Sequence, residues 1–257
     1  SIDEAELVWV VRQGVHIHLD SLHQVEMFGR NFSGRGISVR LNQGIGAGHH
    51  SHVITGGPLS KFGIDIRQIS ELEKLVRRYQ LRITGLHQHI GSNVLDPRIF
   101  LKAMNVLFET ALRFPDLQRL DFGGGIGVPY RPGQERLDLG YLGRKAREAA
   151  AHFTKRYGRH VEMSFEPGRY PVAEAGHLLV QVNDIKHNPT KTFVGVNSGF
   201  NHLIRPAMYG SYHEIVNLTH PRNKMEKVTI AGNICESGDV FAKDRLIARP
   251  EIGDILA

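Results

Sequence analysis

The sequence predicts an α/β fold, a parallel β/α barrel followed by a mostly antiparallel β domain. Strand-like and helix-like segments alternate through the first part of the chain, as parallel βαβ units require. Three motifs follow apolar runs in this part: HQHIGS from His87, DFGGGIG from Asp121 and EPGR from Glu166. The carboxyl ends of the strands of a parallel barrel form one rim, where barrel proteins carry their chemistry. We therefore expect these motifs to meet at one rim.

The elements of the barrel follow from the spacing of its apolar residues. Short apolar runs predict strands at residues 15–19, 37–42, 81–89, 117–122 and 161–165. Apolar side chains at intervals of three and four predict helices at residues 21–30, 68–79, 100–114 and 139–157. Asp20 or Ser21 is expected to cap the first of these helices.

The composition of the sequence changes after EPGR. β-rich segments broken by Asn, Gly and Pro follow, and they predict a mostly antiparallel domain. We therefore place a barrel domain at residues 1–170 and a β domain at residues 171–257. The chain begins at Ser1 rather than at Met and stops in a strand-like run at Ala257. Both domains are accordingly expected to be incomplete, and the sequence to be a fragment of a longer protein.

The composition is that of a globular protein with a sizeable core. The 257 residues are 41% hydrophobic and 23% charged, without repeats. The net charge of +6 suits an anionic small molecule, whereas Lys and Arg are too scattered to favour a nucleic-acid partner. A single cysteine excludes a disulfide framework and favours the reducing cytoplasm. No apolar run reaches the roughly 20 residues needed to span a bilayer, so no membrane association is expected.

The DFGGGIG motif is a candidate phosphate-binding turn. Its glycines leave backbone N–H groups free of side chains where a strand ends, so that a phosphate can approach the main chain closely. A simple tight turn would use glycines in the same way. The motif is not a P-loop, because neither Lys-Ser nor Lys-Thr follows, and its spacing differs from the dinucleotide-binding fingerprint.

The HQHIGS motif offers groups for a planar ligand. His87 and His89 lie two residues apart on a predicted strand and therefore share a face. One imidazole can stack on a ring while the hydroxyl of Ser92 donates to a phosphate. Two satisfied barrel histidines are the alternative, and a metal pair is disfavoured because no third ligand follows at the usual spacing. A solvated loop, rather than a metal site, is expected at three further histidines: His49, His50 and His52.

Two motifs with acidic residues suggest proton chemistry. A buried Glu166 carboxylate facing a heteroaromatic nitrogen would keep that nitrogen protonated, as an electron-sink cofactor requires. An ion pair between Glu166 and Arg169 is the structural alternative. Cys235, the only thiol, precedes Glu236 in a glycine turn, where the thiol can donate a proton and Glu236 can bind a substrate ammonium group. A small buried hydrophobic residue is the alternative for Cys235.

Taken together, these segments resemble the fold type III pyridoxal-phosphate decarboxylases, whose barrel is of the alanine-racemase kind. The match covers nearly the whole chain. SKFGID from Ser60, SGFNHLIRPAMYGSYHEI from Ser198 and CESGDVFAKDR from Cys235 are similar to the branch of the family that acts on meso-2,6-diaminopimelate. The ornithine and arginine branches share the plan but not the stretch from Arg205 to Tyr209. The resemblance implies a lyase of lysine biosynthesis that forms L-lysine and carbon dioxide.

The resemblance implies a pyridoxal 5′-phosphate site on the barrel. It makes His89 the residue stacked on the cofactor ring and places Glu166 against the ring nitrogen. Ser92 and Gly125 would contact the phosphate. Three residues of the EPGR turn complete the implied cofactor-binding set: Pro167, Gly168 and Arg169.

The same resemblance implies the substrate-binding residues. Arg169, Arg205 and Tyr209 would bind substrate carboxylates, and Glu236 would bind the distal amino group. The fork geometry of two arginines suits a substrate with two carboxylates. Cys235 would deliver a proton to the carbon that loses carbon dioxide. The implied catalytic set is Cys235, Glu166 and His89.

A homodimer is implied, because in this family the positions of Cys235 and Glu236 complete the active site of a second subunit. The family's cofactor-binding lysine lies on the first barrel strand, in a segment close to Lys-Ala-Asn. The first lysine here is Lys61, so that segment is expected to lie outside this chain, which would be inactive alone. Asn197 and Asn233 stand where the family implies Asp and Pro.

Two other functions remain open. A related fold type III decarboxylase would act on another amino acid with a distal carboxylate. A homologue that has lost catalysis would serve as a binding or regulatory partner. Because the positions implied for chemistry and substrate binding are occupied by Cys235, Glu236, Arg169 and Arg205, we favour an active enzyme over an inactive homologue.

Overall fold

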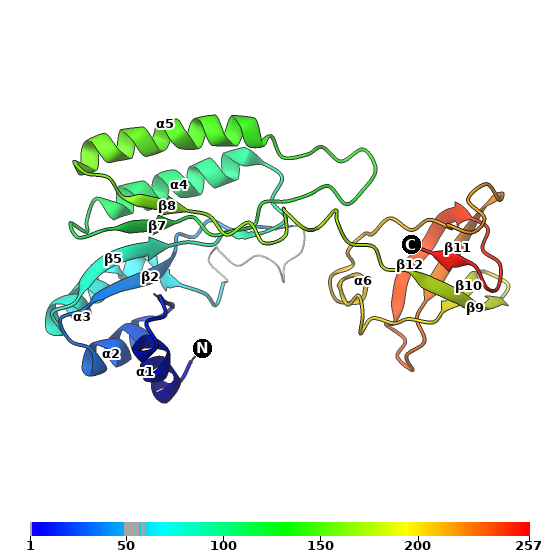
Figure 1. Ribbon diagram of the computed structural model, residues 1–257, viewed down its shortest axis with the longest axis horizontal. Coiled ribbons are helices and arrows are strands. Elements are labelled where there is room, and N and C mark those ends of the chain that lie inside the picture. The colour runs from blue at the N-terminus through cyan, green and yellow to red at the C-terminus, as the bar shows by residue number, and fades with distance from the viewer. Residues whose placement is uncertain (1, 49–56, 58–59) are drawn as a thin grey trace. The chain divides into compact units, whose positions relative to one another are not determined.

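The chain forms two compact units (Figure 1). The computed structural model describes residues 2–48, 57 and 60–257, so His49, His50 and His52 lie outside the described residues. The first unit comprises Ser1–Val128 and Arg136–Val172, and the second comprises Pro129–Glu135 and Ala173–Ala257. Residues 129–135 fall within the predicted barrel range of 1–170 but pack with the second unit, where the Tyr130 ring lies against a guanidinium group.

The first unit contains a parallel sheet whose strand order follows the order of the chain. The sheet runs β1 (His18–Leu19), β2 (Gly36–Asn42), β5 (Arg82–His87), β7 (Arg119–Asp121) and β8 (Glu162–Ser164). β4 (Ile64–Asp65) also pairs with β2, and every pair in this sheet is parallel. A separate parallel pair joins β3 (Ala47–Gly48) to β6 (Gly91–Ser92). Consecutive parallel strands with helices between them are typical of part of an α/β barrel, which confirms the predicted fold class.

Helices precede or connect the strands of the first unit. They are α1 (Glu4–Arg12), α2 (Leu22–Asn31), the short η2 (Ile66–Gln68), α3 (Ile69–Arg78), α4 (Pro97–Ala111) and α5 (Leu139–Tyr157). The side chains of Ser21, Asp96 and Asp138 cap α2, α4 and α5 by accepting backbone N–H groups. In the described part of the chain, no helix combines the length and the apolar composition that crossing a membrane requires.

Some element boundaries differ from the sequence prediction. The strand expected at residues 15–19 is confined to β1, and the strand expected at 81–89 ends at His87. α4 begins at Pro97, before the predicted start, because Asp96 caps it and proline is favoured in the first helical turn. α1 lies where no element is predicted. Its N-terminus is capped by Asp3, whose Oδ1 accepts the N–H of Glu6 at 2.8 Å.

The hydrophobic core of the first unit lies between the sheet and its helices. α2, α3, α4 and α5 contribute, among others, Phe28, Leu72, Phe108 and Phe153. The rings of Phe108 and Phe153 stack with their centroids 4.9 Å apart. This contact joins α4 to α5, which lie side by side in Figure 1. Burying a side chain of this kind contributes roughly 1.5 to 3 kcal/mol. The helices are therefore held against one face of the sheet, and polar groups are left to the other.

Alternation along the strands separates these two faces. Leu19, Val39, Leu86 and Leu120 are buried in the core on the helix side. Their neighbours in sequence point to the opposite face, since successive side chains of a strand alternate. Residues that pair across neighbouring strands form one polar band on that face: His18 with Ser38, Arg40 with His87, and Asp121 with both His87 and Ser164.

The second unit is built on one five-stranded sheet. Its order is β12 (Val240–Ala248), β11 (Met225–Ala231), β10 (Thr192–Val196), β9 (Val180–His187) and β13 (Ile255–Leu256). β10 and β11 are parallel, and the other pairs are antiparallel, which agrees with the mostly antiparallel domain predicted. The core includes Val182, Val194, Ile230 and Phe241. The short helix α6 (Arg205–Tyr209) follows β10 in the chain.

Candidate functional site

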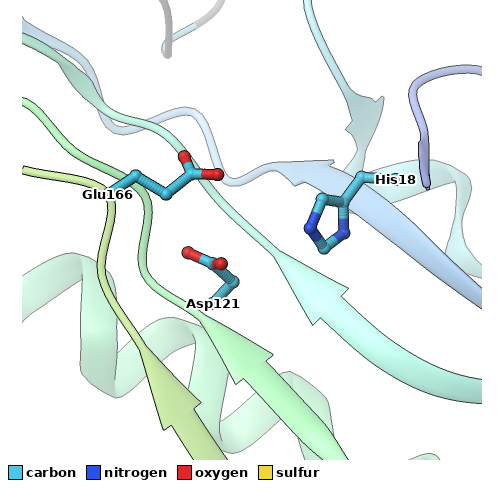
Figure 2. Close-up of side chains that lie close together, drawn as sticks. All are labelled: His18, Asp121 and Glu166. Carbon is cyan, nitrogen blue, oxygen red and sulfur yellow. The ribbon is translucent and has the colours of Figure 1, made fainter. Parts of the chain in front are cut away.

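Four polar side chains meet on the polar face of the first sheet, three from strands β1, β5 and β7 and one from the loop that follows β8. Figure 2 shows three of them: His18, Asp121 and Glu166. One nitrogen of His18 and carboxylate oxygens of Asp121 and Glu166 lie within 4.8 Å of one another. The ring of His87 stacks on that of His18, with the centroids 4.5 Å apart. We call these residues the rim cluster: His18, His87, Asp121 and Glu166.

Asp121 is fixed by hydrogen bonds to both of its carboxylate oxygens. Oδ1 accepts the backbone N–H of Gly123 at 2.8 Å, and Oδ2 accepts the hydroxyl of Ser164 at 2.8 Å. The residue is buried, and a buried carboxylate is stabilised by such charge-assisted bonds. Asp121 therefore ties the beginning of the glycine turn to the neighbouring strand β8.

Burial keeps the imidazoles of this site neutral. Burial and then the charge of His87 lower the pKa of His18 to about 4. Burial and then the charge of Arg40 lower the pKa of His87 to about 4, and the same two causes lower the pKa of His89. Near neutral pH each ring is uncharged and carries one N–H donor and one acceptor nitrogen.

His87 donates a hydrogen bond to Glu166. Its Nε2 lies 3.3 Å from Oε2 of Glu166, while its buried Nδ1 has no hydrogen-bond partner among the described residues. A carboxylate can only accept, so the single proton of the neutral ring belongs on Nε2. The side chain of Glu166 is 50% exposed rather than buried as expected, because it lies beyond the end of β8. Glu166 is thus held by His87 and still accessible to a ligand.

The rim cluster contains the donor types of a metal site. In the part of the chain that the structure describes, His18, Asp121 and Glu166 are the group whose donor atoms lie close enough to share an ion. Both oxygens of Asp121 already accept protein donors. The charge of Arg40, which lowers the pKa of His87, opposes a second cation nearby. We therefore interpret the cluster as hydrogen-bonding groups for an organic ligand.

The three glycines of the DFGGGIG turn are required by close backbone packing. A Cβ on Gly123, Gly124 or Gly125 would lie 2.2, 2.2 or 2.3 Å from a carbonyl oxygen of a neighbouring loop. No side chain fits at such distances. The side of the turn toward which a Cβ would point is therefore filled by neighbouring backbone and is not open to a ligand. The carbonyl groups belong to Gln88, Glu166 and Gly91, respectively.

Two backbone N–H groups of this turn donate hydrogen bonds to other groups of the protein. Gly123 donates to Asp121, and Gly124 donates to Nδ1 of His89 at 3.1 Å. The N–H of Gly125 has no acceptor among the described residues. Gly125 is therefore the glycine of the turn that can donate to an anion, while the bond from Gly124 fixes the ring of His89.

Ser92 and Arg169 form a polar pair on the same unit. Nη2 of Arg169 donates to Oγ of Ser92 at 2.7 Å, although the residues come from different motifs. Ser92 ends β6, and Arg169 follows the turn made by Pro167 and Gly168, in which the N–H of Gly168 donates to the carbonyl of Glu166 at 2.8 Å. A guanidinium beside a hydroxyl suits a phosphate or carboxylate group.

The donor set of the first unit fits pyridoxal 5′-phosphate. Gly125, Ser92 and Arg169 offer one backbone N–H, one hydroxyl and one guanidinium to a phosphate. The neutral ring of His89 offers a flat face to a pyridine ring. The half-exposed carboxylate of Glu166 offers an acceptor to a protonated ring nitrogen.

In the second unit, aromatic rings flank Arg205. Its guanidinium carbon lies 5.5 Å from the ring centroid of Tyr130 and 5.7 Å from that of Tyr209, which is within cation–π range. Nη2 donates to Oγ of Ser211 at 3.2 Å, and the buried Nε has no hydrogen-bond partner among the described residues. Arg205 is therefore held by rings and retains donors that a carboxylate can use.

Cys235 and Glu236 lie on a turn between β11 and β12. Cys235 is an exposed free thiol, which contradicts the alternative of a buried hydrophobic residue. Oε1 of Glu236 accepts the N–H of Gly238 at 3.2 Å, and its backbone N–H donates to the carbonyl of Ile234 at 2.8 Å. The turn therefore presents a thiol and a carboxylate side by side in sequence to the solvent.

Asn197 and Asn233, which stand where the family implies Asp and Pro, both take part in hydrogen bonds to the backbone of the second unit. Oδ1 of Asn197 accepts the N–H of Gln181 at 2.8 Å. The N–H of Asn233 donates to the carbonyl of Ser198 at 3.0 Å. A proline at position 233 has no N–H and could not make that bond.

Sequence reasoning missed two groups of the rim cluster. His18 and Asp121 were not proposed as site residues, although Asp121 begins one of the motifs. The available signals were the alternation His-Ile-His-Leu from His16, which turns both histidines away from the apolar face, and an aspartate directly before a glycine turn.

Comparison with family models identifies the class of protein. Residues 1–173 match the pyridoxal-dependent decarboxylase family model, pyridoxal binding domain. The matched range coincides closely with the end of the first unit at Val172. The chain belongs to the pyridoxal-dependent decarboxylase family, and pyridoxal 5′-phosphate is the cofactor of its barrel.

Comparison with individual proteins confirms the resemblance to the diaminopimelate branch. The chain is 41% identical to the diaminopimelate decarboxylase of Methanothermobacter thermautotrophicus, over 100% of this chain and 62% of that protein. It is 35% identical to that of Escherichia coli K12, over 94% of this chain and 59% of that protein. Diaminopimelate decarboxylase of Helicobacter pylori, solved in complex with L-lysine, matches with a TM-score of 0.85 and 29% identity, over 99% and 64% of the two chains. The chain thus spans about three fifths of the length of these relatives.

Proposed function

We propose that the full-length protein containing this chain decarboxylates meso-2,6-diaminopimelate to L-lysine and carbon dioxide. The observation that carries the proposal is the pairing of neutral His87 with the half-exposed carboxylate of Glu166 on the polar face of the barrel sheet. The similarity to diaminopimelate decarboxylases supports the choice of substrate.

The first unit supplies the groups that bind the cofactor and set its protonation. When bound, pyridoxal phosphate supplies an electron sink for the electron pair of the bond that breaks as carbon dioxide leaves. Glu166 holds a proton at the ring nitrogen, because an ionised carboxylate favours the charged form of a neighbouring base. His87 donates to Oε2 of Glu166 and orients the carboxylate. His89 stacks on the ring.

The remaining residues of the first unit bind the phosphate. Ser92, Gly125 and Arg169 contribute the hydroxyl, the backbone N–H and the guanidinium group. Pro167 and Gly168 shape the turn that carries Arg169. We also propose that Arg169 contacts a substrate carboxylate, since a guanidinium group can bond two anionic groups through separate N–H donors.

The second unit supplies the groups that recognise the substrate. Arg205 and Tyr209 bind the distal carboxylate, and Glu236 binds the distal ammonium group. The thiol of Cys235 donates its proton to the carbon from which carbon dioxide has left. That carbon exchanges a carboxylate for a hydrogen, and the thiolate recovers a proton from solvent.

A comparison of substrates tests the proposal. We expect the full-length protein to turn over meso-diaminopimelate with a kcat/KM at least about 100-fold above those for ornithine and arginine, because a site built for polar groups rejects analogues that lack them. Carbon dioxide release and product analysis measure this. Faster decarboxylation of ornithine or arginine would overturn the substrate assignment and leave the family unchanged. A folded, cofactor-loaded protein that turns over none of them would support the inactive homologue.

We also propose a homodimer in which Cys235 and Glu236 of one subunit serve the barrel of the other. The exposure of their turn supports this, because the two side chains are accessible to a second copy. Cys235→Ala mixed with a variant lacking the cofactor-binding lysine should regain about one quarter of wild-type activity, since random mixing leaves one intact site in each heterodimer. Native mass spectrometry verifies the heterodimers. Their formation without activity would place Cys235 in the site of its own subunit.

We place the reaction in the cytoplasm. The proposed proton donor is a free thiol, and a reducing compartment keeps such a thiol from oxidation.

A further inference from the structure

One buried carboxylate in the second unit joins two segments that carry proposed substrate groups. Asp239 is 3% exposed. Its Oδ1 accepts the N–H of Phe200 at 2.7 Å, and its Oδ2 accepts the N–H of Ile234 at 2.8 Å. Phe200 lies five residues before Arg205, and Ile234 directly precedes Cys235. A single side chain therefore connects the segment leading to α6 with the turn that holds the thiol.

The backbone around Asp239 is shaped to receive the carboxylate. A Cβ on Gly232 would lie 2.2 Å from the carboxylate, and a Cβ on Gly199 would lie 2.8 Å from it. Any larger residue at either position would displace the carboxylate, so the two glycines leave the space that Asp239 fills.

Backbone bonds close the same junction. The N–H of Gly232 donates to the carbonyl of Asp239 at 2.9 Å, and the N–H of Asn233 donates to the carbonyl of Ser198 at 3.0 Å. The N–H of Asp239 itself donates to the carbonyl of Glu236 at 2.9 Å, which fixes the turn around Glu236. Two hydrogen bonds thus join the segments 198–202 and 232–239, one from Asn233 to Ser198 and one from Phe200 to the Asp239 carboxylate, while the other bonds fix the second segment.

Both bonds to the carboxylate are charge-assisted and shielded from water. Neutralising a buried carboxylate weakens the hydrogen bonds that it accepts more than neutralising an exposed one does, because no water can take over as the partner of the N–H groups. Asparagine at position 239 could accept only one of the two N–H groups, since its NH2 group would face the other. The link between the two segments depends on the carboxylate.

We propose that Asp239 is a positioning residue that sets the arrangement of Arg205 relative to Cys235 and Glu236 and thereby the fit of the substrate's distal groups. The inference rests on the proposed function of those three residues. It deepens that function, because it assigns substrate recognition to a side chain that need not touch the substrate.

The second unit provides a matched control in Asp254. Asp254 is 2% exposed and accepts from the N–H of Glu251 at 2.9 Å and from Nδ2 of Asn217 at 2.7 Å. It also lies 2.8 Å from Nδ1 of His220. It therefore joins two segments in the same manner, but neither carries a residue proposed for the substrate.

The test compares Asp239→Asn with Asp254→Asn in the full-length protein. We expect both variants to lower the melting temperature and neither to change cofactor affinity. Only Asp239→Asn should lower kcat/KM for meso-diaminopimelate, by about 100-fold, as a displacement of about 1 Å can do. Hydrogen exchange should show lost protection at Phe200 or at Ile234, whichever N–H group then faces the amide NH2, in Asp239→Asn alone. If Asp239→Asn does not fold, Gly199→Ala, which displaces the carboxylate without removing it, replaces it.

The outcomes separate this inference from the proposed function. Equal kinetics for the two variants, in a wild type that decarboxylates meso-diaminopimelate, would overturn the positioning role and leave the function intact. A wild type that prefers another amino acid, with that activity lost in Asp239→Asn and retained in Asp254→Asn, would overturn the substrate and support the positioning role.

Discussion

Replacing Glu166 by glutamine in the full-length protein is expected to lower turnover of meso-diaminopimelate by about 100-fold or more. The amide is neutral and cannot hold the proton at the ring nitrogen, so the electron sink is weakened while the phosphate contacts remain. Cofactor occupancy should therefore change little. Stopped-flow or steady-state assays of the cofactor-saturated variant measure the turnover, and absorbance measures the bound cofactor.

Glu162→Gln is the matched control for this variant. Glu162 lies on β8, the strand that precedes Glu166, and its side chain is 59% exposed in an ion pair with Arg119. An exposed pair contributes about 0 to 1 kcal/mol, so this variant should keep wild-type turnover. A Glu166→Gln protein that is loaded with cofactor and as active as Glu162→Gln would make Glu166 a structural residue.

Arg205→Ala is expected to lower kcat/KM for meso-diaminopimelate by between about 30-fold and several thousandfold, the equivalent of about 2 to 5 kcal/mol. The guanidinium lies against the rings of Tyr130 and Tyr209 with its Nε buried, so a substrate carboxylate would meet a half-buried donor group. Removing this group leaves that carboxylate without a partner. Steady-state kinetics with meso-diaminopimelate, ornithine and arginine measure the loss.

Arg249→Ala controls for the loss of one positive charge from the second unit. Arg249 is 60% exposed and pairs with Glu251 at 3.5 Å, so its removal should leave the kinetics unchanged. Activity of Arg205→Ala equal to that of Arg249→Ala would remove Arg205 from substrate recognition. In that event Asn197, where the family implies Asp, is the next position to substitute.

The parts of the fold that depend on local sequence could be predicted well. α5 occupies the predicted residues 139–157, because Asp138 caps its N-terminus and Gly158 follows its C-terminus in the left-handed conformation. α2 follows Ser21, one of the two caps expected. α1 was missed, although Asp3 followed by Glu6 is a capping signal, because the helix buries little beyond Leu7 and its apolar periodicity is weak.

The parts of the site that depend on strand register could not be predicted. The pairing of His87 with Asp121 across β5 and β7, and the stacking of His87 on His18, arise from the alignment of strands far apart in sequence. Apolar periodicity shows which face a side chain takes but not which residue lies opposite. For the same reason the glycine turn was expected to be open to a phosphate, while Gly123 and Gly124 are packed against neighbouring backbone.

The chain crosses between its two units three times, after Val128, after Glu135 and after Val172. The middle excursion, residues 129–135, brings Tyr130 to Arg205 in the second unit, although it follows directly on the glycine turn of the first. A single genetic crossover near residue 172 would replace residues 173–257 by those of a relative. Residues 129–135, which also belong to the second unit, would stay those of the original protein. Recombination between relatives in this family should preserve function only when residues 129–135 and residues 173–257 come from the same parent.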